Sequence, residues 1–192
     1  MLSGLWPFCW PRGQVHELVL FVATLIVLTV WAVWMGEGWR GPAGALLAWG
    51  LLALGWIDAK HYYLPDVLTL PLIGLGLLVI AVFELDQFGI HLAGALLAYA
   101  AFRLINWIYL RMRGVEGLGA GDAKLLAASG AWLGLGVLPE VVLIGALSAL
   151  VWTLGQRLTR PDALALDTKI PFGAYLAAAT WIVWIFDPVL FP

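Results

Sequence analysis

The sequence has few charges and almost no cysteine. Only 11% of its 192 residues are charged and Cys9 is its only cysteine, whereas soluble domains carry about 25% charged residues. A single cysteine excludes a disulfide within the chain and a paired CxxC metal site. The formal net charge of −2 provides no basic surface for a nucleic acid, so we expect no nucleic-acid partner.

Apolar residues dominate instead. They make up 63% of the chain, with 12 tryptophans among them, and a membrane-spanning helix needs about 20 in a row. We therefore expect an all-α membrane protein, with one integral-membrane domain over residues 1–192 built as a polytopic bundle of about seven transmembrane helices. The expected spans are residues 15–35, 42–57, 65–83, 89–110, 122–138, 139–156 and 170–186. The second, fifth and sixth of these are short.

The basic residues fall on one side of the expected bundle. Nine of the ten lysines and arginines lie in connections, or near span ends, that share a side, and the positive-inside rule makes that side the cytoplasm. The N-terminus is then expected in the cytoplasm and the C-terminus outside. Arg40 lies on the other side, and the nine are Arg12, Lys60, Arg103, Arg111, Arg113, Lys124, Arg157, Arg160 and Lys169.

Two aspartates are expected at the cytoplasmic ends of their spans. Asp58 ends the second span, and Asp122, 64 residues later, begins the fifth after a glycine-rich turn. Ionisable residues at membrane depth are costly and often mark functional sites. Two carboxylates held close together share a proton, so one can draw a proton from water while the other protonates a carbonyl oxygen, which is the chemistry that hydrolyses an amide without a metal. The competing interpretation is that each aspartate caps a helix end or faces water.

Three stretches of the chain resemble a known family. GLGAGDAKLLAASGAWLG at 117–134 resembles the GxGD motif of the type IV prepilin peptidases, which are aspartic proteases of the bacterial inner membrane. Asp58 is followed by a short basic stretch and then by LPDVLTLP at 64–71, as in that family. KIPFGAYLA at 169–177 is similar to a stretch near the family's C-terminus. The matches keep the family's order and cover roughly residues 42–190.

The resemblance implies a membrane aspartic endopeptidase with Asp58 and Asp122 as its two catalytic residues. Such an enzyme removes the basic leader of type IV prepilins or type II secretion pseudopilins, on the cytoplasmic side of the inner membrane. Its partners would be a substrate with a hydrophobic N-terminal helix and the membrane lipid. We expect no metal or other cofactor, because the three histidines are scattered along the chain.

One feature of the family is expected to be absent. Many members carry a cytoplasmic domain with paired CxxC zinc sites, associated with methylation of the new N-terminus. In this chain only GEGWRG at 36–41 joins the first two spans. We therefore expect a peptidase core without N-methyltransferase activity.

Residues near the two aspartates are further candidates for the site. Gly119 and Gly121 permit a turn that a substrate backbone can approach. Lys124 is placed to tune a carboxylate or hold a lipid head group, Glu116 to meet a basic leader, and Asp66 to line the site by the family likeness. Each has a structural alternative. The glycines could only permit a tight entry into the helix, and Lys124 could extend to the membrane interface. Glu116 could be a solvated acid of a loop, and Asp66 could cap a helix. Farther along the same span, a GxxxG pair at 130 and 134 predicts close packing against the second span.

Three other kinds of function remain open. Ser129 with His91 would suit a serine intramembrane protease, but the two are expected at different depths. A non-catalytic membrane scaffold or assembly factor of a pilus or type II secretion system would use the carboxylates to contact a partner. A proton-coupled transporter fits less well, because both aspartates lie at one face and few acids line the middle of the spans.

Overall fold

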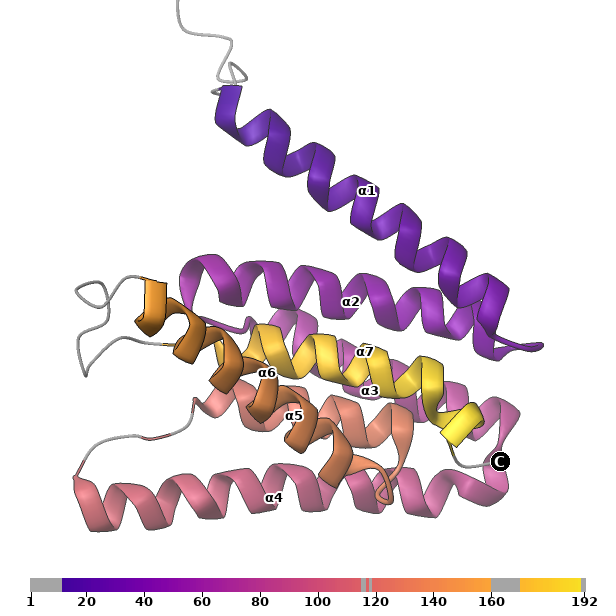
Figure 1. Ribbon diagram of the computed structural model, residues 1–192. Helices are drawn as coiled ribbons and strands as arrows, with labels where there is room; N and C mark the ends of the chain where they lie inside the picture. The colour runs from indigo at the N-terminus through magenta and orange to yellow at the C-terminus, as the bar shows by residue number, and fades with distance from the viewer. Residues whose placement is uncertain (1–11, 115–116, 118, 160–169, 191–192) are drawn as a thin grey trace, which may run out of the picture.

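The computed structural model describes residues 12–114, 117, 119–159 and 170–190. Within these residues the chain forms seven α-helices, one short 3-10 helix and no strand (Figure 1). Each expected span corresponds to one α-helix, so the predicted all-α bundle of about seven helices is confirmed. The elements are α1 (Arg12–Met35), α2 (Arg40–His61), α3 (Asp66–Phe83), η1 (Leu85–Gln87), α4 (Phe88–Arg113), α5 (Ala120–Leu133), α6 (Leu138–Thr159) and α7 (Phe172–Leu190).

The helices differ in whether they are long enough to cross a membrane. Five segments of the described chain are long and apolar enough: His16–Trp34, Arg40–His61, Asp66–Phe83, Leu85–Arg113 and Leu138–Leu158. α2 and α6, expected to be short, each have 22 residues, because their polar last turns continue the helix beyond the apolar run. α5 has only 14 residues, which is about 21 Å at 1.5 Å per residue. The apolar part of α7, Phe172–Phe186, is also shorter than a usual span.

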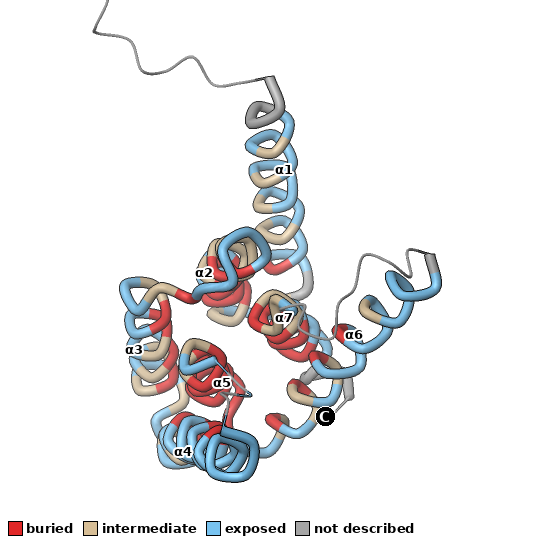
Figure 2. The backbone as a smooth tube through the Cα atoms, turned by 90° about the vertical axis from the view of Figure 1, so that its left-hand side faces the viewer, coloured by how far each residue is buried: buried red, intermediate tan, exposed pale blue. Residues whose placement is uncertain are grey.

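α5 lies in the centre of the bundle, enclosed by its neighbours (Figure 2). Eleven of its 14 residues are buried, and it packs against α3, α4 and α7. A helix surrounded by other helices does not have to present 20 apolar residues to lipid, so its short length is compatible with a place inside the bundle. Its alanines and glycines let the surrounding backbones approach closely.

The closest approach of α5 is to α4. A Cβ atom added to Gly130 would lie 2.4 Å from the carbonyl carbon of Gly94 in α4, so only glycine fits there. A Cβ atom added to Gly94 would in turn lie 3.0 Å from the carbonyl carbon of Gly134. The GxxxG pair therefore packs α5 against α4, and the expectation that it packs against α2 is wrong.

Successive helices run in alternate directions, so helix ends gather at opposite ends of the bundle (Figure 1). α2, α4 and α6 end where α3, α5 and α7 begin, at the left in Figure 1. We call this the aspartate end, because Asp58 lies in the last turn of α2 and Asp122 in the first turn of α5. Most of the described basic residues lie at the same end, namely Lys60, Arg111, Arg113, Lys124 and Arg157.

The turn after α2 carries an apolar side chain into the aspartate end. Tyr62 has φ 54°, the left-handed conformation, and its N–H donates to the carbonyl oxygen of Asp58 at 2.8 Å. It is the one non-glycine residue with positive φ in the described chain. Pro65 then precedes α3. Between them Leu64 is only 4% exposed, although it belongs to a connection and not to a helix.

Candidate active site

Asp58 is held by the beginning of α7. The residue is 5% exposed, and its Oδ2 accepts the N–H of Ala174 at 2.9 Å. The backbone N–H of Gly173 also acts on this carboxylate. The first N–H groups of a helix have no partner within the helix, and the positive end of the helix dipole favours a nearby negative charge. The start of α7 is therefore a binding site for the carboxylate of Asp58.

Asp122 is held by the glycine-rich turn before α5. Its side chain is 9% exposed and accepts the backbone N–H of Gly119, the residue that precedes the helix. Asp122 is the third residue of α5, so this contact is one half of a capping box; the other half is missing because Gly119 has no side chain. Helix capping, proposed from the sequence as an alternative to a functional role, is thus one thing that Asp122 does. Capping and catalysis are compatible, because one carboxylate oxygen can accept the N–H while the other carries or takes a proton.

The fold brings the two aspartates together. They are 64 residues apart in the sequence, yet Leu64 lies against Gly121, the neighbour of Asp122, and against Gly173, which lies against Asp58. Both aspartates are at the same end of the bundle. α3 and α7 each pack against both α2 and α5, so these two helices position α2 and α5 relative to each other.

Leu64 packs between the two sides of the site. A Cβ atom added to Gly121 would lie 2.8 Å from Leu64 Cβ, and one added to Gly173 would lie 2.8 Å from Leu64 Cδ1 and 2.9 Å from Asp58 Oδ2. A methyl group at Gly121 would therefore displace Leu64, and one at Gly173 would displace the ends of the Leu64 and Asp58 side chains. Gly119 also has a close neighbour: a Cβ atom added to it would lie 3.0 Å from Asp122 Oδ2. Close packing thus explains the glycines of this turn, which were expected to admit a substrate.

Lys124 and Asp66 form an ion pair, with Lys124 Nζ 2.5 Å from Asp66 Oδ1. The pair joins the first turns of α5 and α3. Asp66 is the first residue of α3, after the N-cap Pro65, so it lies in the first turn, where a negative charge favours the helix dipole. Both residues are close in sequence to Asp58 or Asp122, but the charged partner of each is the other member of this ion pair. Glu116, the fifth expected neighbour, lies outside the described residues.

Several residues of the site were not expected from the sequence. Leu64, Gly173 and Ala174 touch or flank the carboxylates, and Asn106 of α4 accepts the N–H of Gly117 at 3.1 Å, which ties the glycine-rich turn to the bundle. Gly173 and Ala174 belong to the stretch at 169–177 that carries the family likeness. Asn106 had a weaker signal: it is a polar residue within an apolar span, and it is 8% exposed.

The serine and histidine of the rival hypothesis have separate partners. Ser129 Oγ lies 2.7 Å from Thr180 Oγ1 of α7 and also donates to Leu125 O at 3.1 Å. His91 Nδ1 lies 3.1 Å from the carbonyl oxygen of Ala131. Because α5 is short, the depths of Ser129 and His91 differ less than expected. Their contacts, rather than their depths, give each of them a structural role.

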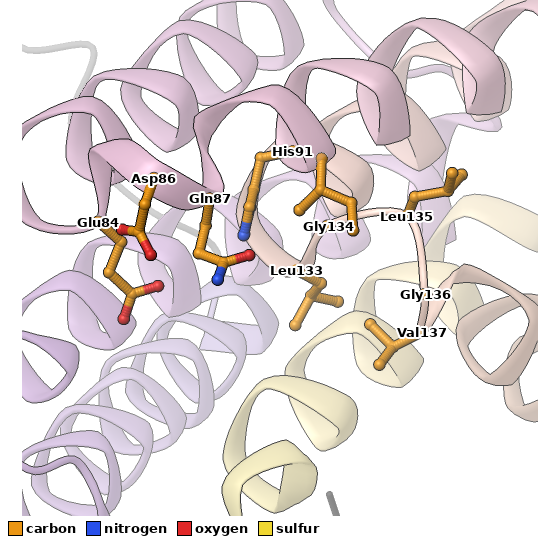
Figure 3. A pocket seen from close by; sticks show the side chains of 10 residues that line it. Glu84, Asp86, Gln87, His91, Leu133, Gly134, Leu135, Gly136 and Val137 are labelled. Atoms are coloured by element: carbon orange, nitrogen blue, oxygen red, sulfur yellow. The ribbon is translucent and has the colours of Figure 1, made fainter.

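A cavity of about 470 Å³ lies at the other end of the bundle. Figure 3 shows Glu84, Asp86, Gln87 and His91 beside the turn that follows α5 at 134–137. These residues belong to the end where α3 finishes and α4 begins, opposite Asp58 and Asp122. This cavity is therefore separate from the two buried aspartates.

Comparison with known proteins finds relatives that are named as leader peptidases. A protein named prepilin leader peptidase/N-methyltransferase from Pseudomonas aeruginosa is 40% identical over 88% of this chain and 58% of its own length. Proteins of the same name from Stutzerimonas stutzeri (40% identical, 81% of this chain, 54% of the relative) and Aeromonas salmonicida (39%, 95% and 64%) are similar to it as well. The chain thus spans 54% to 64% of the length of these relatives.

No solved structure matches the chain. The model of the type IV leader peptidase family matches residues 45–154, more than half of the 192 residues. The matched segment contains both buried aspartates, Leu64 and the glycine-rich turn. This protein belongs to the type IV leader peptidase family.

Proposed function

We propose that this protein is a membrane aspartic endopeptidase that removes the N-terminal leader of type IV prepilins or pseudopilins. The observation that carries the proposal is the meeting of Asp58 and Asp122, two buried carboxylates from different helices, at one end of the bundle. Two like charges in a buried place repel each other, so helix capping alone gives no reason to bring them together. The names of the relatives support the same reaction.

In this reaction the two carboxylates have different tasks. Asp58 faces two backbone N–H groups from the start of α7, whereas Asp122 faces one before α5. Such donors favour the ionised form, so we assign to Asp58 the task of taking a proton from a water molecule. The water oxygen then bonds to the scissile carbonyl carbon, while protonated Asp122 gives its proton to the carbonyl oxygen. When this gem-diol intermediate collapses, the carbon–nitrogen bond breaks and the proton held by Asp58 passes to the leaving amine. One hydroxyl group returns its proton to Asp122 as the new carbonyl forms, so both aspartates regain their starting states.

The remaining residues position these two. The turn with Gly119 and Gly121 forms a wall of the site, and the Lys124–Asp66 ion pair keeps the start of α5 beside the start of α3. We further propose that Glu116 meets the basic leader of the substrate.

The distribution of charge supports a cytoplasmic site. Lys60, Lys124 and the arginines at the end of α4 lie at the aspartate end, whereas acidic residues, among them Glu84 and Asp86, lie at the opposite end. By the positive-inside rule the aspartate end faces the cytoplasm. The protein is then a multi-pass protein of the bacterial inner membrane, with its N-terminus and its active site on the cytoplasmic side.

Cleavage of a co-expressed prepilin, followed as a shift in gel mobility, tests this function. Asp58→Asn and Asp122→Asn keep the size of each side chain and remove its acid, and each is expected to lower cleavage by at least about 10²-fold. Asp86→Asn, at the opposite end, is the matched control and is expected to cleave like the wild type. Membrane extraction and thermal unfolding in detergent check that each variant is folded.

Two results would contradict the proposal. Cleavage by both aspartate variants at the wild-type rate would remove the catalytic assignment. Failure of the wild type on several prepilins and pseudopilins would favour a non-catalytic scaffold or assembly factor of a pilus or secretion system.

A further inference from the structure

An apolar groove begins beside Asp58 and runs along the outside of the bundle. It encloses about 370 Å³ between α1, α2 and α7. At the aspartate end it is lined by Ala59, which follows Asp58 in the chain, and by Ala174, whose N–H binds Asp58. Its far end is lined by Ala48 and Ile182. The nine residues from 174 to 182 span about 12 Å, or roughly two turns of helix.

The groove is built from small and apolar side chains. Thr24 supplies the one hydroxyl group among its lining residues, and the others are alanine, glycine, leucine, isoleucine and tryptophan. A Cβ atom added to Gly55 would lie 3.6 Å from Ala177 Cβ, so α2 and α7 approach closely along the groove. Small residues in such a stripe let another helix come near the backbone.

The wall formed by α1 leaves the groove accessible from the bilayer. α1 packs against α2 and stands apart from the rest of the bundle (Figures 1 and 2). Only 6% of its apolar window is buried. Contacts with α2 hold it in place, including the ring contact of Phe21 with Trp56 at 5.5 Å and the ion pair of Glu17 with Lys60. α1 therefore covers the α2 side of the groove, and the α7 side can be contacted by another molecule.

We propose that this groove seats the apolar helix of the prepilin-type substrate, which enters sideways from the bilayer. The inference rests on the proposed function. A substrate cut just before its membrane helix must place the start of that helix beside the catalytic carboxylates. One end of this groove is lined by Ala59, the chain neighbour of Asp58, and by Ala174, whose N–H binds Asp58. The substrate helix lies parallel to α7, because its cytoplasmic end meets Ala174. A lipid chain would fill the same space without any need for the groove to reach the aspartate.

A disulfide cross-link tests this seat. In a Cys9→Ser and Asp122→Asn background, which stops cleavage, Ala178→Cys places a thiol in the groove. Ala146→Cys, an exposed position on α6 outside the groove, is the matched control. The partner is a prepilin that the wild-type protein cleaves, with single cysteines placed in turn along its apolar helix. We expect cross-links at Ala178→Cys that recur every three to four substrate positions, and none above background at Ala146→Cys.

A kinetic measurement gives a second readout. Ala178→Phe narrows the groove and is expected to raise the KM for the full prepilin at least about tenfold with kcat nearly unchanged, since it removes substrate binding and not chemistry. Ala146→Phe is expected to leave both parameters as in the wild type.

The outcomes separate this inference from the proposed function. If the wild type cleaves prepilin but Ala178→Cys gives no cross-link, or no more than Ala146→Cys, the groove is not the seat. An unchanged KM in Ala178→Phe would overturn the inference equally. If the wild type cleaves no prepilin, the function itself fails and the inference falls with it.

Discussion

Acidic residues occupy both ends of the bundle, but their surroundings differ. At the aspartate end, Asp58 and Asp122 are 5% and 9% exposed and accept N–H groups from the starts of helices. At the opposite end, Asp86 is exposed and lies with Glu84 at the edge of a wide cavity. A carboxylate in water needs no protein partner, whereas a buried one must be hydrogen-bonded. What distinguishes the candidate site is therefore the backbone that the fold brings to each acid.

The largest effect is expected from a single methyl group at Gly173. Gly173→Ala places a Cβ atom 2.9 Å from Asp58 Oδ2 and 2.8 Å from Leu64 Cδ1, so the carboxylate or the start of α7 must move. A displacement of 1 Å at a catalytic group can cost about 10²-fold in rate, and we expect a loss of that order in prepilin cleavage. Gly89→Ala, at the opposite end with no atom within 4 Å of the added Cβ, is expected to cleave normally. Equal activity of the two variants would show that the backbone around Asp58 tolerates a methyl group as well as the opposite end of the bundle does.

Leu64→Ala tests how much the Leu64 side chain, which packs against Gly121 of α5 and Gly173 of α7, contributes to stability. The buried leucine is 4% exposed, and its truncation is expected to lower the free energy of unfolding by about 2–5 kcal/mol, measured by thermal unfolding in detergent. Leu85→Ala at the opposite end, where the side chain is 70% exposed, is expected to change it by less than about 0.5 kcal/mol. A similar loss in both variants would mean that Leu64 carries no special packing.

Gly130→Ala asks how tightly the central helix is held. Its added Cβ would lie 2.4 Å from backbone atoms of Gly94, which cannot swing away as a side chain can. Separation of α4 and α5 is expected to cost about 1–3 kcal/mol of unfolding free energy. Gly74→Ala in α3, where the added Cβ has no atom within 4 Å, is the control. If Gly130→Ala is as stable as Gly74→Ala, α5 is free to shift and does not fix the position of Asp122.

The smallest effect is expected from the Lys124–Asp66 ion pair. The side chain of Asp66 is 54% exposed, and exposed pairs contribute roughly 0–1 kcal/mol. A double-mutant cycle with Asp66→Asn and Lys124→Met is expected to give a coupling energy in that range, and exchanging the two residues is expected to restore it. A coupling well above this range would show that the pair belongs to the site more closely than its exposure suggests.

Much of the fold follows from patterns that are local in the sequence. Apolar runs predicted a helix at each of the seven expected spans, and the side on which basic residues accumulate predicted that Asp58 and Asp122 lie at one end. The packing partner of α5 was not predicted correctly. A GxxxG pair indicates close packing, but it does not say which helix is the partner.

No local sequence pattern predicted which groups would bind the carboxylate of Asp58. Asp58 and Ala174 are 116 residues apart, and a backbone N–H has no side-chain signature. Leu64 begins the stretch at 64–71 that carries the family likeness, but its burial was not predicted, because it depends on the left-handed turn at Tyr62. Both features depend on the tertiary fold, so they become visible only when the helices are assembled.

The hydrogen bond from Ala174 to Asp58 has a consequence for synthesis. α7 follows α2 and α5 in the chain, and until α7 inserts, Asp58 lacks the N–H of Ala174 that binds it. The aspartates of a nascent chain are therefore present but unassembled until α7 joins the bundle. If the proposed function holds, hydrolytic activity would appear only after α7 has inserted.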